Sequence, residues 1–155
     1  MLDKKNPFDD IAIAANYEQW YLGEGLYADK EEKNVLAWVL KKFSDPKTML
    51  EVGCGTGHFS RWFETLNLIV TPLDISMKMI NEARNENHLN YLVGDAVGLP
   101  FSANSFDVVT FYYSSNQSLS PQTKRYRATD NGIYSSIKGT RTGCCSRSNE
   151  YCDCR

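Results

Sequence analysis

The first third of the chain contains a stretch whose apolar residues recur with helical spacing. They fall three or four positions apart, on one face of a helix: Val35, Leu36, Val39, Leu40 and Phe43. Asp29 and Glu32 have the spacing of a capping box, so we expect the helix to begin at Asp29. The segment SDPK at residues 44–47 ends it, because proline disfavours helix in the residue before it.

From residue 48 onward, short apolar runs alternate with helical patterns. The runs at 48–52, 68–74, 90–95 and 106–112 predict strands. Between them, one amphipathic helix is expected to begin close to Gly57 and another after Ser76, its cap. Strands that alternate with helices form right-handed crossovers and a mainly parallel sheet. We therefore predict an α/β fold with a Rossmann-like, doubly wound sheet that helices cover on both faces.

The character of the sequence changes near Tyr112. Residues 1–111 contain 36 Leu, Ile, Val, Met and Phe residues, whereas residues 112–155 contain three. The first part has ten basic against sixteen acidic residues and the second has seven against three, so their net charges are −6 and +4. The second part is too poor in apolar residues for a packed core. We therefore expect a helical cap at 1–47, a ligand-binding core at 48–112 and an atypical, poorly packed tail at 113–155.

Composition narrows the class of protein further. With 155 residues, 42% of them hydrophobic, the chain suffices for one domain, and its net charge of −2 gives no reason to expect binding to nucleic acid. No apolar run approaches the roughly 20 residues that span a bilayer, and no signal peptide is recognisable, so we expect a cytoplasmic protein. The tail cysteines match no usual zinc spacing, and we expect no metal site: Cys144, Cys145, Cys152 and Cys154.

Three glycines separated by single residues follow the first predicted strand, at Gly53, Gly55 and Gly57. Glycine permits a tight turn with positive φ and lets the backbone approach a ligand closely. The N-terminus of the next helix favours an anionic group. No lysine follows to complete a P-loop, and the third glycine lies one place too early for the dinucleotide motif G-x-G-x-x-G. On the glycines alone, a turn that only packs tightly is an alternative.

Three acidic residues end successive strands, since Asp74 lies 23 residues after Glu51 and Asp95 lies 21 residues after Asp74. In open α/β sheets these positions border the ligand crevice. At about 5 Å and an effective dielectric of about 20, a carboxylate repels a pyrophosphate by roughly 3 kcal/mol but attracts a cation. Asp74 can accept from both hydroxyls of a ribose, and Asp95 from an adenine amine. A cationic nucleoside with an amino-acid end, S-adenosylmethionine, fits this set; for each acid alone, helix capping or solvation is the alternative.

These motifs resemble those of class I S-adenosylmethionine-dependent methyltransferases, in particular the type 11 family. EVGCGTG is similar to the family's first motif and LDISMKMINEAR to its second-strand motif. GDAVGLPFSANSFDVV is similar to the third-strand acid, the following loop and the fourth strand. The resemblance covers residues 48–109 nearly continuously, and residues 8–32 are similar to the helical cap of some members.

The resemblance implies a cofactor site built from these motifs and from the cap. It assigns the following residues: Tyr17, Glu51, Gly53, Cys54, Gly55, Gly57, Asp74, Ile75, Met79, Asp95 and Ala96. The glycine turn and the acid before it would hold the methionine part, and the acid of the second strand would hold the ribose. Ile75 and Met79 would flank the adenine, and Asp95 with the Ala96 amide would contact its amine. Tyr17 and the nearby aromatic residues Trp20 and Tyr21 would close over the sulfonium, with simple aromatic packing as the alternative.

Methyl transfer from a sulfonium depends mainly on alignment of the reacting atoms, so we name no catalytic residue. His58 and His88 are interpreted as capping or surface residues. We expect a methyltransferase with a small-molecule acceptor. One alternative is a non-catalytic cofactor-binding remnant or truncated fragment, and a second is a nucleotide-dependent oxidoreductase.

The sequence departs from the family in two places. Pro72 lacks an amide donor at a position where glycine is commoner in the family, which affects the pairing of that strand. After the fourth strand, the further helix, fifth strand and closing hairpin of the family are not recognisable, so we expect an incomplete C-terminal part. A changed reading frame or a recombination would account for the altered tail. A homo-oligomer could cover the exposed edge of the sheet.

Overall fold

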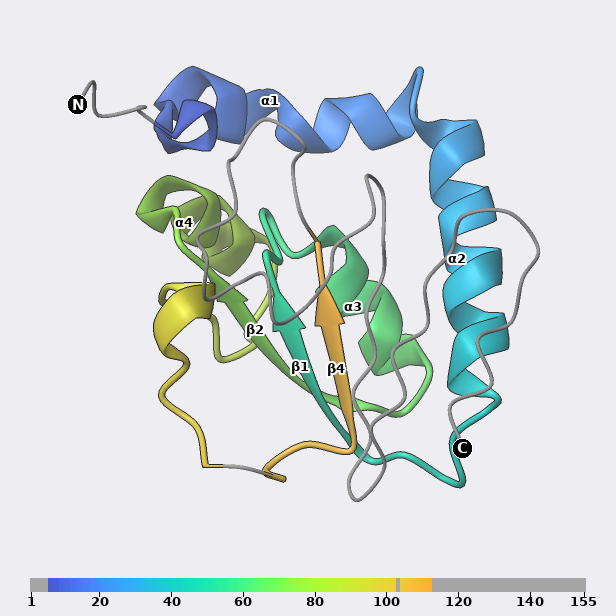
Figure 1. Cartoon of the computed structure of the whole chain (residues 1–155). Helices are drawn as coiled ribbons and strands as arrows, with labels where there is room; N and C mark the ends of the chain where they lie inside the picture. Colours follow the sequence, from blue (N-terminus) through green and yellow to red (C-terminus); the bar gives the residue numbers. More distant parts are fainter. Residues whose placement is uncertain (1–5, 103, 113–155) are drawn as a thin grey trace.

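The computed structural model describes residues 6–102 and 104–112. The predictions for the tail, its cysteines and the origin of its sequence fall at 113–155 and lie outside the described residues. In the described part, a parallel sheet lies beneath helix α1 (Ile11–Leu22), and α2 (Leu26–Leu40) descends beside it (Figure 1). Within this part, no helix combines the length and apolar character needed to cross a membrane.

After the two N-terminal helices, strands and helices alternate as predicted. The elements are η1 (Pro7–Asp9, a 3-10 turn before α1), β1 (Thr48–Val52), α3 (His58–Thr65), β2 (Ile69–Asp74), α4 (Met77–Glu86), β3 (Leu92–Val93), η2 (Ala96–Gly98, a second 3-10 turn) and β4 (Val108–Phe111). Gly57 is the N-cap of α3, and the Ser76 hydroxyl caps α4 by accepting from the Met79 amide at 3.3 Å. Both predicted helix starts are therefore confirmed.

All pairs of neighbouring strands are parallel, in the order β3-β2-β1-β4. The chain moves outward from β1 to β3 and then returns to place β4 on the other side of β1. This reversal creates a topological switch point between β1 and β4, where open α/β sheets bind ligands at the carboxyl ends of their strands. The order confirms the predicted Rossmann-like sheet.

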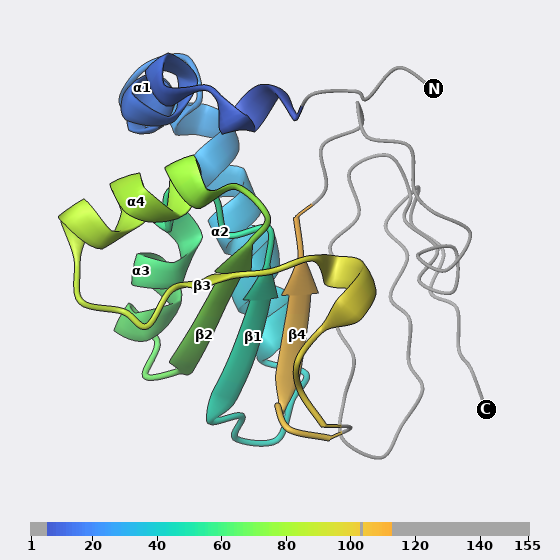
Figure 2. The ribbon, with the colours of Figure 1, turned by 90° about the vertical axis from the view of Figure 1, so that its left-hand side faces the viewer.

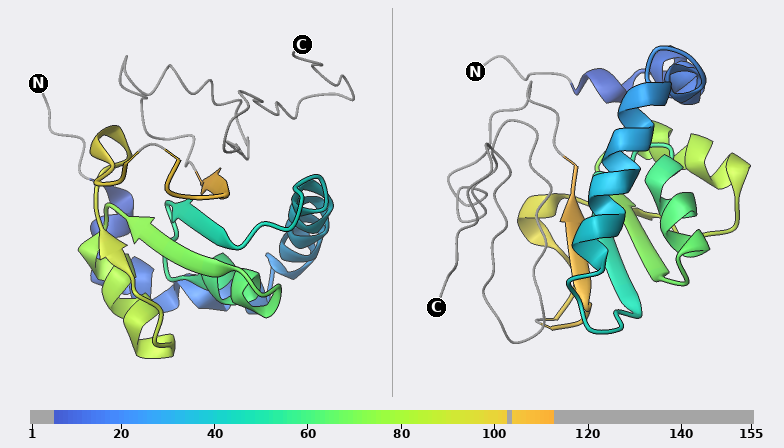
Figure 3. Two further views of the ribbon diagram at one scale, coloured as in Figure 1. Left: turned by 90° about the horizontal axis from the view of Figure 1, so that it is seen from below. Right: turned by 90° about the vertical axis from the view of Figure 1, so that its right-hand side faces the viewer.

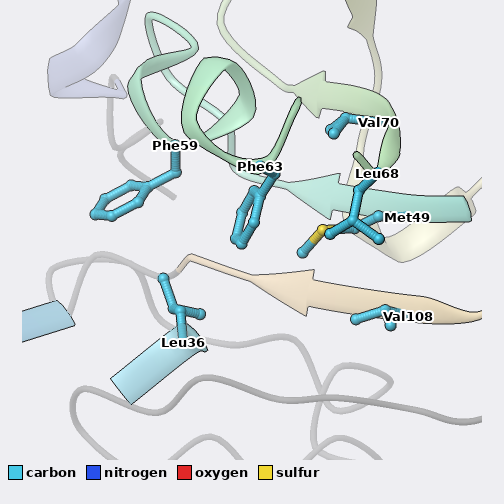
Figure 4. Close-up of a cluster of buried hydrophobic side chains, with 7 residues drawn as sticks. All are labelled: Leu36, Met49, Phe59, Phe63, Leu68, Val70 and Val108. Carbon is cyan, nitrogen blue, oxygen red and sulfur yellow. The ribbon is translucent and has the colours of Figure 1, made fainter. Parts of the chain in front are cut away.

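Helices α2, α3 and α4 lie on one face of the sheet (Figure 2). Two successive right-handed crossovers in the same direction, β1 to β2 and β2 to β3, place α3 and α4 on the same side. The main apolar core lies between this face and the helices, and Figure 4 shows its buried side chains: Leu36, Met49, Phe59, Phe63, Leu68, Val70 and Val108. Burial of these side chains attaches α2 and α3 to the sheet.

The opposite face is covered by the connection from β3 to β4 (Figure 3). Leu50, Val52 and Leu73 point to this face, and residues of the connection pack against them: Ala96, Leu99, Phe101 and Phe106. The crossover from β3 to β4 contains η2 where the prediction had expected helical cover. In the described residues, helices therefore cover one face and an irregular apolar segment covers the other.

The start of α2 differs from the prediction. The helix begins at Leu26, its N-cap is Gly25, and no side chain caps it. Asp29 lies in the first turn, where its carboxylate accepts from the Lys33 ammonium at 2.7 Å and contacts the His58 imidazole at 2.7 Å. The predicted capping box is wrong, because these tertiary partners hold the Asp29 carboxylate.

Strand β3 is shorter than predicted, and Pro72 explains its limited pairing. The Asp74 carbonyl accepts from the Gly94 amide at 2.9 Å, so the Asp74 backbone faces β3. Because alternate residues of a strand present their backbone groups to the same neighbour, Pro72 faces β3 as well and offers it no amide hydrogen. Pairing between β2 and β3 accordingly begins at Leu73 and ends at Asp74.

Gly57 is expected to tolerate no side chain. Its φ is +80°, and an added Cβ would collide with the hydroxyl of the buried Tyr91. Gly57→Ala should lower the free energy of unfolding by at least about 2 kcal/mol, through left-handed strain and overpacking. Urea denaturation measures this loss. Gly98→Ala is the control, because no atom lies within 4 Å of its added Cβ; equal stability of the two variants would contradict the prediction.

Candidate functional site

A cavity of about 480 Å³ opens at the carboxyl ends of the four strands. This volume lies in the range of roughly 300–1,000 Å³ that is usual for small-molecule sites. Helix α1 and η1 contribute to its walls together with the strand ends. Eight of the predicted site residues line it: Tyr17, Gly53, Gly55, Asp74, Ile75, Met79, Asp95 and Ala96.

In the glycine turn between β1 and α3, some glycines permit close packing and another leaves space for a ligand. Gly53, Gly55 and Gly57 all have positive φ, at 82°, 55° and 80°. A Cβ on Gly53 would collide with the Tyr112 carbonyl, so this glycine permits close packing of β1 and β4. Of the residues that the structure describes, only Tyr17 would meet a Cβ on Gly55, at 3.9 Å, and this Cβ would occupy space between the turn and α1. Gly55 therefore leaves room for a ligand above the turn.

Asp74, at the end of β2, connects two loops of the site. Its Oδ2 accepts from the Gly55 amide at 2.8 Å, and its Oδ1 accepts from the Ser76 amide at 2.8 Å. Burial raises the pKa of Asp74, and the amide hydrogen bonds oppose that rise. Because each carboxylate oxygen can accept a second hydrogen bond, Asp74 can hold the turn and still receive two hydroxyls.

Asp95 follows β3 and lies beside the remaining predicted adenine contacts. Its Oδ1 accepts from the Val97 amide at 2.9 Å and so caps η2, which begins at Ala96. Ile75 is 52% exposed, whereas Met79 is buried in α4. The structure thus brings Asp74, Asp95 and these neighbours to one cavity at the ends of β2 and β3.

Glu51 lies behind the wall of the cavity. Its side chain is 1% exposed, its Oε2 accepts from the Ser60 hydroxyl at 2.5 Å, and its Oε1 has no hydrogen-bond partner among the described residues. Burial raises the pKa of Glu51 to about 8, which keeps a proton on it near neutral pH. Its predicted contact with a ligand stays a prediction.

Cys54 and Gly57 also do not line the cavity. Cys54 is buried among Ile80, Ala83 and Tyr91, and its burial raises the pKa of its thiol. An uncharged, enclosed thiol is a poor nucleophile. No group of three side chains suited to hold a metal ion occurs within the described residues.

Sequence reasoning missed part of the cavity wall. Glu32, Phe59 and Tyr112 line it, although the pattern had assigned Glu32 to a capping box and had placed none of the three in a ligand site. The Tyr112 ring stacks on Phe59 with centroids 5.0 Å apart. No local pattern places Tyr112 here, because its position depends on β4 lying beside β1. Trp20 and Tyr21 line the cavity beside Tyr17, where the resemblance had placed them.

A cluster of polar side chains attaches the cap to the core. The His58 imidazole, at the start of α3, contacts Glu18 of α1 at 3.3 Å and Asp29 of α2 at 2.7 Å, and it stacks on Tyr21 with centroids 3.6 Å apart. Arg61 of α3 pairs with Glu18 at 2.9 Å. His58 is therefore a tertiary contact residue, a role that the sequence had described only as capping or surface.

Glu18 makes the stability of the cap depend on pH. Burial alone would raise the pKa of Glu18, but hydrogen bonds from His58, Thr56 and Arg61 lower it from 4.5 to about 2. A carboxyl whose folded-state pKa is depressed stabilises the fold above its unfolded pKa and loses that contribution as the pH falls through its folded pKa. The relevant window runs from about pH 4.5 down to about pH 2.

Glu18→Gln should therefore lower the free energy of unfolding at pH 7 by about 1 kcal/mol, after allowance for solvent screening. Urea denaturation of wild type and variant should show the difference shrinking toward zero as the pH approaches the lower end of that window. Glu24→Gln, in the exposed turn after α1, is the matched control. A difference that is the same at pH 7 and in acid would contradict the ionic origin of the contribution.

Comparison with known proteins supports what the geometry indicates. The family model of the methyltransferase domain matches residues 50–126. A malonyl-[acyl-carrier protein] O-methyltransferase from Buchnera aphidicola is 34% identical over 110 residues, which are 70% of this chain and 42% of that protein. A second protein of that name, from Pectobacterium atrosepticum, is 41% identical over 61 residues, or 24% of its length. The chain thus spans less than half the length of these curated relatives.

Among solved structures, Streptomyces venezuelae DesVI has a TM-score of 0.55 and 25% identity, covering 66% of this chain and 43% of that chain. CalS10 from Micromonospora echinaspora, described as an amino pentose methyltransferase with bound SAM, has a TM-score of 0.53 and 28% identity, covering 63% of this chain and 41% of its own. The parallel sheet and its glycine turn thus have the fold of the class I S-adenosylmethionine-dependent methyltransferases. Residues 50–126 match the type 11 methyltransferase domain family, to which we assign this part of the chain.

Proposed function

We propose that this chain transfers a methyl group from S-adenosylmethionine to a small-molecule acceptor. The observation that carries the proposal is one continuous cavity along the carboxyl edge of the sheet, lined by the open glycine turn, Asp74 and Asp95. Family membership supports the reaction class, and the solved relative with bound SAM supports the cofactor.

The side chains at the ends of β2 and β3 fit the nucleoside part of this cofactor. Asp74 has an acceptor position left on each oxygen for the ribose hydroxyls, while its amide bonds hold it in place. Asp95 can accept from the adenine amine, and Ile75 and Met79 provide apolar contact on either side of the ring. The space above Gly55 suits the methionine part, because among the described residues only Tyr17 comes within 4 Å of an added Cβ, at 3.9 Å.

Tyr17, Trp20 and Tyr21 would close the cavity from the side of α1. Tyr17 and Tyr21 form an edge-to-face pair with centroids 6.0 Å apart. Aromatic rings attract a cation through their π-electron density, so this wall suits a sulfonium. When bound, the cofactor supplies an electrophilic methyl group, and the chain's contribution is to align the acceptor with it and to exclude water.

The two alternative functions, a nucleotide-dependent oxidoreductase and a non-catalytic remnant, differ in what the same cavity would have to bind or do. A dinucleotide would bring a pyrophosphate to a wall that contains three carboxylates and, among its described residues, no lysine, arginine or histidine. That charge distribution favours the sulfonium cofactor over a nucleotide-dependent oxidoreductase. A non-catalytic remnant would bind the cofactor without transferring its methyl group, so binding and transfer need separate measurements.

Asp74→Asn tests the ribose contact. We expect it to weaken binding of S-adenosylhomocysteine by about 1–3 kcal/mol, because charged hydrogen bonds are lost. Isothermal titration calorimetry of the wild type and the variant measures the affinity for S-adenosylhomocysteine, S-adenosylmethionine and NAD.

Asp45→Asn is the control, since Asp45 is exposed and pairs with Lys47, away from the cavity lining. Unchanged affinity in Asp74→Asn would mean that the ribose lies elsewhere. Binding of NAD with no binding of either adenosyl compound would overturn the proposed function, and cofactor binding without transfer to any acceptor would identify a remnant.

A further inference from the structure

Glu32 is the cavity carboxylate to which the cofactor assignment gives no role. The cavity follows the order of the strands, with the proposed nucleoside residues at the ends of β3 and β2 and Tyr112 at the end of β4. The β4 end is therefore the part of the cavity left for the acceptor. Glu32 reaches this cavity from α2.

Glu32 shares the cavity lining with the aromatic residues Tyr21, Phe59 and Tyr112. Its negative charge contributes to the raised pKa of Tyr17, Tyr21 and Tyr112, although burial is the largest cause for each. Tyr21 contacts Phe59 with centroids 6.1 Å apart, and Phe59 stacks on Tyr112. A carboxylate thus shares the cavity lining with a connected set of aromatic rings.

Two polar groups at this end lack partners within the described part of the chain. Glu32 is an exposed residue of the cavity rim and makes no hydrogen bond or ion pair with the described residues, whereas the neighbouring Asp29 is held by Lys33 and His58. The Tyr112 hydroxyl is buried and likewise has no hydrogen-bond partner. Buried polar groups normally find partners, so an unpaired hydroxyl in the lining of a cavity that also contains carboxylates points to a ligand with hydrogen-bond donors.

The charge of the cavity lining restricts that ligand further. The described residues of the wall include Glu32, Asp74 and Asp95 but no basic side chain. One sulfonium cofactor, with a net charge of about +1, offsets only part of this negative charge. A carboxylate or phosphate acceptor would add to the repulsion, whereas an ammonium group offsets it.

We infer that, if the chain is the proposed methyltransferase, its acceptor is an amine with an apolar or aromatic body, held by Glu32 and the Tyr112 hydroxyl. The amine arrives as an ammonium ion and donates hydrogen bonds to both oxygens. A proton passes from its nitrogen to the Glu32 carboxylate, which frees the nitrogen lone pair. That pair forms the new N–C bond as the S–C bond breaks with its electrons left on sulfur, and Glu32 later releases the proton to water.

The assignment separates this chain from its curated relatives. The matched Buchnera and Pectobacterium proteins are named as O-methyltransferases of a malonyl group. CalS10, in contrast, is described as acting on an amino pentose. The carboxylates of the cavity favour an amine acceptor over a carboxylate acceptor for this chain.

Calorimetry on the full chain saturated with S-adenosylhomocysteine tests the inference with two matched series of probes. One series is 2-phenylethylamine, 2-phenylethanol and 3-phenylpropanoate, and the other is glucosamine, glucose and gluconate. We expect the amine of at least one series to bind at least about tenfold more tightly than its alcohol, the gain typical of a charged hydrogen bond, and the carboxylate to bind more weakly than the alcohol. The same amine should gain a methyl group from S-adenosylmethionine, as measured by mass spectrometry.

Glu32→Gln should weaken binding of that amine by about tenfold or more and leave the affinity for the alcohol unchanged. Its unchanged affinity for S-adenosylhomocysteine would show that the variant is folded. Glu31→Gln, on the same helix but outside the cavity lining, is the control and should bind the amine like the wild type.

The outcomes distinguish failure of the proposed methyltransferase function from failure of the amine inference. If the wild type does not bind S-adenosylhomocysteine, the proposed function fails and the amine inference fails with it. If S-adenosylhomocysteine binds but no amine is preferred in either series, or if Glu32→Gln keeps the amine preference, only the amine inference is overturned.

Discussion

The site depends on the hydrogen bonds that the Asp74 carboxylate accepts from two backbone amides. One amide belongs to Gly55, in the turn after β1, and the other to Ser76, before α4. These bonds join two loops that are 19 residues apart in sequence, and they fix the height of the glycine turn above the sheet. The same interaction positions Asp74 itself, because both oxygens are held while an acceptor position remains on each. The glycine turn, the Asp74 carboxylate and the start of α4 thus form one hydrogen-bonded unit.

Much of this unit could be predicted from local sequence. Positive φ at Gly53, Gly55 and Gly57 follows from glycine in a tight strand-to-helix turn, and the Ser76 cap follows from its place before a helical pattern. The parallel sheet follows from alternation of strands and helices. These features depend on short-range chemistry, which a single sequence contains.

Other features depend on contacts between distant segments and could not be predicted. Asp29 has the spacing of a cap, yet Lys33 and His58 bind its carboxylate, so tertiary contacts overrode the local preference. Glu51 ends a strand as Asp74 does, but its side chain turns toward α3 and Ser60. Alternation along β1 determines which face of the sheet Glu51 occupies, whereas its distance from the cavity depends on how α3 packs. Phe59 and Tyr112 meet only because β4 returns to the side of β1.

The return of β4 to the side of β1 also separates the two ends of the cavity along the chain. The proposed nucleoside end is built from β2, β3 and the segments after them, whereas the other end is built from the cap and the last residue of β4. The hydrogen bonds of Asp74 do not involve β4, whereas the cap contacts one of the loops that Asp74 holds, because the Ser76 hydroxyl donates to the Phe8 carbonyl at 2.9 Å. The strand order thus allows the β4 end of the cavity to change its lining while the Asp74 hydrogen bonds at the other end stay in place.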